Sequence, residues 1–138
     1  MTLKMTGTAA SNGVGIAPAY IVDKPDLSFE KRRISDPFAE IQRFKDALLT
    51  ISNDLRELKK AATKKLSKDE LAIFDVHIEI LDDPEMFNQV VTRIRSQRIN
   101  AETAFEEVIT RVIHEFESMT GNKYMQERAT DFASIRDQ

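Results

Sequence analysis

The chain has 138 residues, the length of one ordinary domain, with 31% charged and 7% aromatic residues and a formal net charge of −3. This balance is typical of a soluble folded protein and gives no support to a polyanion-binding surface, so we expect no nucleic-acid ligand. Cysteine is absent, which excludes disulfides, thiolate metal sites and cysteine nucleophiles. No apolar run is long enough to cross a membrane, and we expect a cytoplasmic protein without membrane contact.

The N-terminal third is the part that does not have a helical pattern. Residues 7–22 combine small and β-branched residues around Ser11-Asn12-Gly13, a turn signal. They predict one or two short strands within an extended arm that covers residues 1–34. Because two strands do not form a stable sheet alone, we expect them to pair with something outside this chain or to pack on the helices.

A long amphipathic helix is predicted from Pro37 to Leu66. Ser35-Asp36-Pro37 is a strong helix start, with a capping side chain followed by proline at the first helical position. The apolar residues that follow alternate three and four positions apart, which is the spacing of a heptad seam. They are Ile41, Phe44, Leu48, Ile51, Leu55, Leu58 and Ala62.

Three further helices follow at short intervals. Ser67 and Glu70 match a capping box and open a second helix that extends to about Leu81. Asp83-Pro84 repeats the signal of a cap followed by proline and opens a third helix. Asn100 opens a fourth, which Gly121 ends.

These elements predict an all-α fold, a four-helix bundle of antiparallel helical hairpins with a short extended N-terminal arm. The bundle covers residues 35–121. A last amphipathic helix, residues 122–138, is expected to lead away from it as a linker.

The second helix carries more apolar surface than one contact requires. On a helical wheel, Leu71, Phe74, Ile78 and Leu81 form one stripe, and Ile73, Val76 and Ile80 form a second on a different arc. Two readings remain open. The second stripe meets another helix of the bundle, or it is an apolar patch with an acidic rim that binds a partner.

His77 falls between the two stripes. A metal site would need further ligands, and the Glu-x-x-His motif of di-iron bundles is absent because position 74 is Phe and position 111 is Arg. No glycine-rich turn supports a catalytic role. We therefore predict no catalytic residue and no metal ligand, with His77 half buried at a boundary and His114 an ordinary helix-face residue.

Six stretches of the sequence carry a family resemblance. They are GTAASNGVGIAPAY, PDLSFEK, AIFDVHIEILDDPEM, INAETA, FESM and YMQERATD, in this order over nearly the whole chain. Together they resemble the N-terminal region of Enzyme I of the bacterial phosphoenolpyruvate:sugar phosphotransferase system. The resemblance implies the first strands of that protein followed by its helical domain, which binds the carrier protein HPr.

The resemblance also implies a function for the parent protein. Enzyme I takes a phosphoryl group from phosphoenolpyruvate with magnesium, holds it on a histidine and passes it to HPr. The Thr-Ser-His motif of that histidine is absent here. We therefore expect an HPr-binding module that has no cofactor and is not catalytic alone. The intact parent is expected to be a homodimer, and the strands of residues 7–22 to belong to its absent phosphohistidine domain.

Matched to the family pattern, the HPr surface is expected to use the second and third helices and the last one. The expected contact residues are Asp69, Ala72, Ile73, Asp75, His77, Glu79, Ile80, Glu85, Met86, Met125 and Arg128. Acidic residues would steer a basic carrier, while Ile80, Met86 and Met125 would supply the apolar contact. Two alternatives remain: a structural or oligomerising bundle, and a nitrogen-related paralogue with a different HPr-like carrier.

Overall fold

The computed structural model describes residues 2–8, 11–22, 26–119 and 121–137. Within these ranges the fold is all-α, as predicted, and has five helices: α1 (Pro37–Ala62), α2 (Lys68–Leu81), α3 (Pro84–Gln97), α4 (Ala101–Ser118) and α5 (Lys123–Arg136). None of these helices is both long enough and apolar enough to span a membrane.

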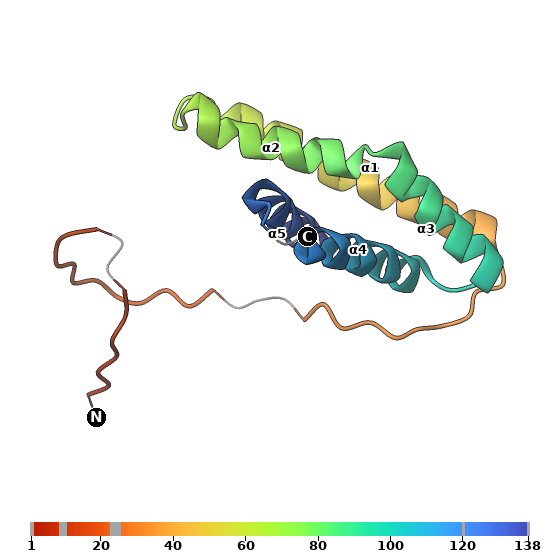
Figure 1. Ribbon diagram of the computed structural model, residues 1–138, viewed down its shortest axis with the longest axis horizontal. Helices are drawn as coiled ribbons and strands as arrows, with labels where there is room; N and C mark the ends of the chain where they lie inside the picture. Colours follow the sequence, from red (N-terminus) through yellow and green to blue (C-terminus); the bar gives the residue numbers. More distant parts are fainter. Residues whose placement is uncertain (1, 9–10, 23–25, 120, 138) are drawn as a thin grey trace.

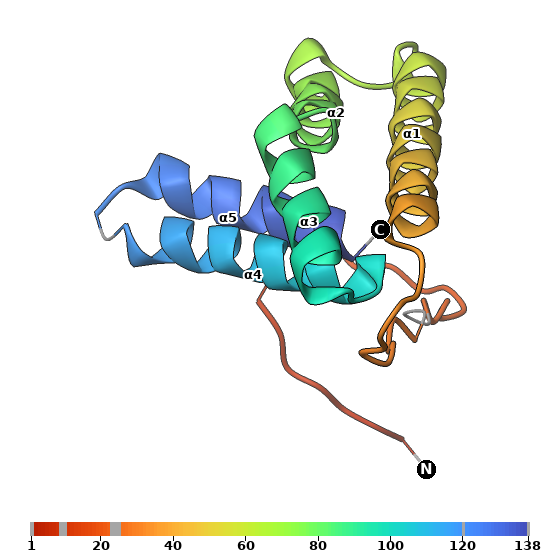
Figure 2. The same ribbon diagram turned by 90° about the vertical axis from the view of Figure 1, so that its right-hand side faces the viewer.

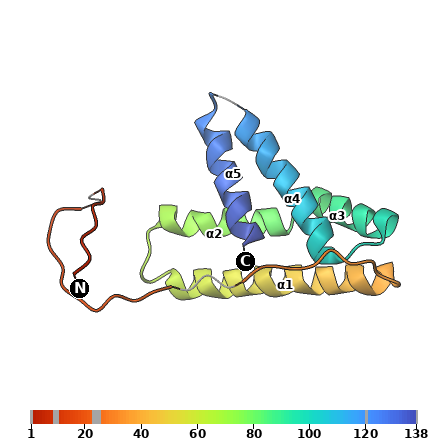
Figure 3. The same ribbon diagram turned by 90° about the horizontal axis from the view of Figure 1, so that it is seen from below.

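The helices form two crossing layers (Figures 1 and 2). In one layer α2 and α3 follow each other roughly end to end and run antiparallel beside α1. In the other, α4 and α5 form an antiparallel hairpin that lies across the first layer, as Figure 3 shows. The contacts of α4 with α3 and of α5 with α2 join the two layers. The predicted bundle of antiparallel hairpins is confirmed.

The predicted helix starts of α1, α2 and α3 are confirmed by their caps. The side chain of Asp36 accepts hydrogen bonds from the first-turn amides of α1, and Asp83 accepts one from the amide of Glu85. Ser67 and Glu70 form the reciprocal bonds of a capping box at the start of α2. Each cap satisfies backbone amides that have no partner inside the helix.

α1 ends at Ala62, four residues before the predicted Leu66. The amides of Lys65 and Leu66 both donate to the carbonyl of Ala62, at 2.8 and 3.0 Å. The chain therefore closes a turn here and brings Ser67 into position to cap the antiparallel helix α2.

The core lies between the two layers. Val90 and Ile94 of α3 and Ala104, Val108 and Ile109 of α4 have no exposed surface. Around Phe44 of α1, the rings of Phe87 and Phe105 lie with centroids 5.9 and 5.8 Å away. Burial of an aliphatic or aromatic side chain of this size contributes about 1.5–3 kcal/mol, so these core residues are a main source of stability.

Helix α5 is part of this core. Ala129, Phe132 and Ile135 are buried, and Phe132 lies against Phe116 of α4 with ring centroids 5.4 Å apart. The segment that we expected to be a linker thus packs as a helix of the bundle. That this helix links the bundle to a further domain stays a prediction, and so do the domain boundaries after residues 34 and 121.

The N-terminal arm has a different structure from the one predicted. Residues 2–8 and 11–22 contain no strand, and Val14, Ile16 and Tyr20 are each at least 89% exposed. Ala9 and Ala10, inside the expected strand segment, lie outside the described residues. Two extended segments alone bury too little surface to stabilise the hydrogen bonds of a sheet. The described residues of the arm therefore form no strand pair.

The arm is attached to the bundle just before α1. Arg33 forms an isolated antiparallel bridge with Ile99, and Asn100 makes the neighbouring contacts. Asn100 occupies the N-cap position of α4 as predicted, but its side chain forms no cap hydrogen bond. Instead its Oδ1 accepts from Arg32 N at 3.1 Å, and Glu40 caps α4 by accepting from Ala101 N at 2.7 Å.

Candidate functional site

The second apolar stripe of α2 divides between the core and the surface. Ile80 is buried and Val76 packs against the core, on a helix that touches both α1 and α5. Ile73 is 51% exposed, one to two turns closer to the start of the helix. The reading in which the stripe meets another helix is therefore right for Val76 and Ile80, and Ile73 remains available to a partner.

Two of the predicted contact residues need correction. Ile80 and Met86 were expected to supply apolar contact to a carrier, yet each is only 4% exposed and belongs to the core cluster. The helices packed across α2 and α3 cover them, which position along a single helix does not reveal. Neither side chain can touch a partner in this conformation.

Five of the other predicted residues lie on the halves of α2 and α5 that lead away from the crossing of these helices. Asp69, Ala72 and Ile73 are exposed on the first half of α2, while Met125 and Arg128 are half-buried on the first half of α5. Figures 2 and 3 show that these two halves point away from the crossing in different directions. We call these side chains, with His77 and Tyr124, the α2–α5 surface.

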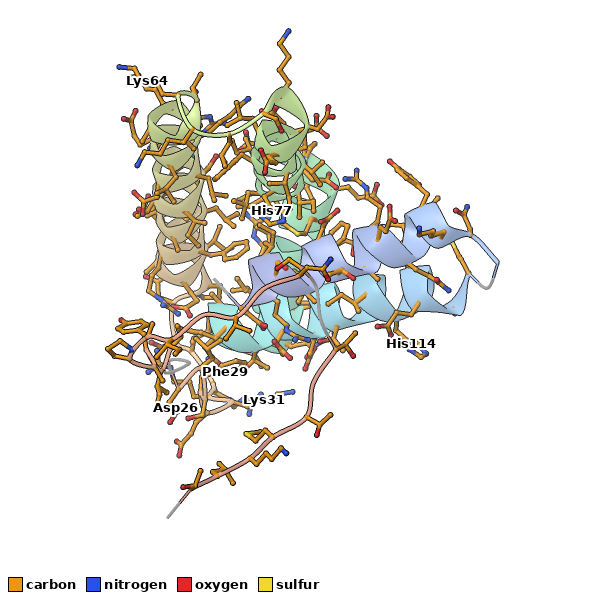
Figure 4. The ribbon with its side chains drawn as sticks, turned by 90° about the vertical axis from the view of Figure 1, so that its left-hand side faces the viewer. Asp26, Phe29, Lys31, Lys64, His77 and His114 are labelled. Carbon is orange, nitrogen blue, oxygen red and sulfur yellow. The ribbon has the colours of Figure 1, made fainter. Side chains whose placement is uncertain are left out.

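His77 lies at the crossing itself, on the side of α2 that faces α5 (Figure 4). Its side chain is 12% exposed, and its Nε2 lies 3.8 Å from Oδ1 of Asp131 on α5. Nε2 is the one buried polar side-chain atom without a hydrogen-bond partner in the described residues. An unpaired buried nitrogen costs about 1–3 kcal/mol, so its position calls for an explanation.

Arg128 is held by an aromatic neighbour. Its guanidinium carbon lies 5.9 Å from the ring centroid of Tyr124, a cation–π distance, and Tyr124 is 60% exposed. Tyr124 was not among the predicted contact residues, although its spacing of four from Arg128 on a helix was a signal. Asp131 was not predicted either, because its neighbour His77 is on another helix and the spacing along α5 carries no signal of it.

The predicted acidic residues do not all lie on this surface. Asp75 points towards α1, where its Oδ1 lies 2.5 Å from Nζ of Lys59. Glu79 is exposed on α2, and Glu85 is exposed in the first turn of α3, where it accepts from Gln89 at 3.3 Å. The exposed acidic side chain one turn from Ile73 is therefore Asp69, while Glu79 is exposed further along α2.

The strongest electrostatic coupling lies away from the α2–α5 surface. Arg43 bridges Glu40 and Glu102, with both distances 2.7 Å. Hydrogen bonding from Arg43 holds the pKa of Glu102 down to about 2, against a desolvation that acts in the other direction, and also lowers the pKa of Glu40. This network joins the start of α1 to the start of α4.

A mostly apolar groove of about 760 Å³ lies beside this network and contains none of the predicted contact residues. Its lining combines Phe44 and Leu48 of α1, Phe105 of α4 and Ile135 of α5 with residues 27–29 of the arm. In the described ranges no three histidine, aspartate or glutamate side chains come together as a metal site. The α2–α5 surface offers apolar, acidic and cationic groups suited to binding a protein.

Comparisons with known proteins agree with this fold. The model of the family "PEP-utilising enzyme, N-terminal" matches residues 6–128. The chain is 43% identical over 132 residues to the phosphoenolpyruvate-protein phosphotransferase of Latilactobacillus sakei, covering 96% of this chain and 23% of that protein. It is 41% identical over 135 residues to that of Enterococcus faecalis, covering 98% and 24%. The chain thus spans about a quarter of the length of these curated relatives.

A solved structure is also similar. The NMR solution structure of an Enzyme I protein superposes with a TM-score of 0.76 at 26% identity, covering 82% of this chain and 46% of that one. This agreement in sequence and fold confirms the resemblance to the N-terminal region of Enzyme I. The chain belongs to the family of PEP-utilising enzymes and contains their N-terminal region.

Proposed function

We propose that the α2–α5 surface docks HPr or a closely similar carrier, so that the parent enzyme can pass it a phosphoryl group from phosphoenolpyruvate. The observation that supports this most is the half-exposed Ile73, one turn from the exposed Asp69 on α2, together with Arg128 and Tyr124 on the diverging half of α5. An apolar centre with charged groups around it is the usual composition of a transient protein interface.

The burial of Ile80 and Met86 changes which side chains carry the apolar contact. In this proposal Ile73, Ala72 and Met125 replace them, with the ring of Tyr124 beside Arg128. These side chains form a small patch, which suits a carrier that has to leave after each transfer. Asp69 and Glu79 would steer a basic carrier, so the association rate should fall as salt is added.

The chemistry is assigned to the parent protein. The resemblance implies that magnesium and phosphoenolpyruvate act with a histidine outside this sequence, while His77 is a contact residue. Incubated with labelled phosphoenolpyruvate, magnesium and HPr, this chain alone should remain unlabelled. Label on His77 would overturn this division of roles.

Docking is tested by titrating the isotope-labelled chain with HPr and following amide shifts by NMR. We expect shifts to cluster at Ile73, His77, Met125 and Arg128. His114, exposed on the outside of α4, should not respond. No shift at about 1 mM carrier, which corresponds to a binding free energy weaker than about −4 kcal/mol, would exclude docking and favour a structural or oligomerising role.

A matched pair of variants tests the site. Ile73 of α2 and Leu49 of α1 are both 51% exposed, so aspartate at either position should be tolerated by the fold. Ile73→Asp should weaken carrier binding by about fivefold or more, the loss expected for an interface residue worth above about 1 kcal/mol, while Leu49→Asp should leave it unchanged. A nitrogen-related paralogue would show tighter binding to the HPr-like carrier of that branch than to HPr.

A further inference from the structure

Asp131 of α5 is a residue outside the predicted contact set. Its carboxylate lies 3.8 Å from the unpaired Nε2 of His77, across the crossing of α2 and α5. The two side chains are 22% and 12% exposed, so little water reaches either. The separation is about 0.6 Å longer than the range of an N–H···O hydrogen bond, a gap that rotation of the two side chains can close.

The charged residues nearest to His77 and Asp131 along their own helices have other partners. Arg128, one turn before Asp131 on α5, is drawn to the ring of Tyr124. Asp75, near His77 on α2, is paired with Lys59 of α1. Among the described residues, His77 is the one basic side chain that lies within 4.0 Å of the Asp131 carboxylate.

We propose that Asp131 is a positioning residue for the α2–α5 surface. Its carboxylate accepts a hydrogen bond from the Nε2–H of His77. A carboxylate that is hydrogen-bonded to one nitrogen of the imidazole ring selects the tautomer that carries the proton on that nitrogen. It also fixes the orientation of the ring. The other nitrogen, Nδ1, is then an acceptor. This role rests on the proposed docking of a carrier, because His77 is assigned as one of its contacts.

The same bond fixes α2 relative to α5. His77 and Asp131 lie at the crossing, and the two halves of the α2–α5 surface diverge from it. A bond at this point therefore determines the separation between Ile73 on one half and Arg128 on the other. The carrier meets a surface whose two parts are already placed, which lowers the ordering cost of binding.

The test uses the whole 138-residue chain and three variants. Asp131→Ala removes the acceptor, and Asp131→Asn keeps an oxygen acceptor without the charge. Glu127→Ala removes an acidic group of α5 whose side chain is 65% exposed and whose partner is Lys123. Long-range nitrogen–proton NMR spectra report the tautomer of His77, and calorimetric titration with HPr reports affinity.

We expect the Nε2–H tautomer of His77 in the unaltered chain and in Asp131→Asn, and its loss in Asp131→Ala. HPr affinity should fall about three- to tenfold in Asp131→Ala, the effect of one ordinary hydrogen bond, and stay within about twofold in the other two variants. A purely structural role would lower stability without changing the tautomer.

Two negative results are distinguishable. If the unaltered chain binds HPr and Asp131→Ala changes neither the His77 signals nor the affinity, the positioning role is wrong and docking stands. If the unaltered chain does not bind HPr, docking itself is wrong, and so is the role assigned here to Asp131.

Discussion

The side-chain amide of Asn100 donates a hydrogen bond to the carbonyl of Glu30, 3.3 Å away, although the two residues are 70 positions apart. Asn100 is 2% exposed, and its Oδ1 also accepts from Arg32 N and from Thr103 Oγ1. One buried side chain therefore attaches the end of the arm to the turn between α3 and α4.

Replacing Asn100 with alanine should lower the free energy of unfolding by about 3 kcal/mol, because it leaves buried backbone groups without partners. Urea unfolding followed by circular dichroism measures this loss. Asn53→Ala, at an exposed position of α1, is the control and should change stability by less than about 0.5 kcal/mol. Equal effects of the two variants would show that the Asn100 contacts do not hold the arm.

The burial of the second α2 stripe predicts opposite outcomes for two isoleucines. Ile80→Asp places a charge in the core and should destabilise the fold by more than about 4 kcal/mol, enough to prevent folding. Ile73→Asp, at a half-exposed position, should cost less than about 1 kcal/mol. Thermal unfolding measures both. A stable Ile80→Asp variant would mean that Ile80 is not buried in the core.

The Arg43 network predicts a pH dependence of stability. The pKa of Glu102 in the folded chain is about 2, below its ordinary value of 4.5, and that of Glu40 is also lowered. Because folding lowers these pKa values, the stabilisation is complete above pH 4.5 and disappears as the pH falls from there towards 2. Since the Glu102 side chain is 35% exposed, solvent screening reduces its contribution to about 1 kcal/mol.

Arg43→Met tests this contribution. At neutral pH the variant should unfold more easily than the unaltered chain, and the difference should shrink as both are acidified to about pH 2. Urea unfolding at a series of pH values measures it. Arg95→Met, at an exposed position of α3, is the control and should show no such pH-dependent difference. A difference that does not change with pH would contradict the assignment.

The capping box of α2 predicts a smaller effect. Ser67→Ala removes the side chain that accepts from Glu70 N, and should lower the free energy of unfolding by about 1 kcal/mol. Ser96→Ala, near the end of α3 at an exposed position, should cause no loss. Amide hydrogen exchange in the first turn of α2 should rise in the first variant alone. Unchanged exchange would show that the cap does not hold this turn.

Several features of this fold were predictable because they depend on neighbouring residues. The starts of α1, α2 and α3 follow from a capping side chain and a proline or glutamate within three positions. Asn100 is an exception at the start of α4. Its side chain does not cap the helix, because it forms hydrogen bonds with Glu30 and Arg32 instead. The described part of residues 7–22 contains no strand, since a strand needs a partner, and the prediction placed that partner outside this chain.

The sequence by itself determined the all-α class, the helix starts and the family, because these depend on local spacing and on matching motifs. The tertiary structure alone decided that α5 crosses α2, that Ile80 is buried while Ile73 is exposed, and that Asp131 lies near His77. A wheel shows which side chains share a face of one helix, but the neighbour that covers this face comes from a distant part of the chain. For this reason the position of Ile80 along α2 did not reveal that this predicted contact residue would be buried.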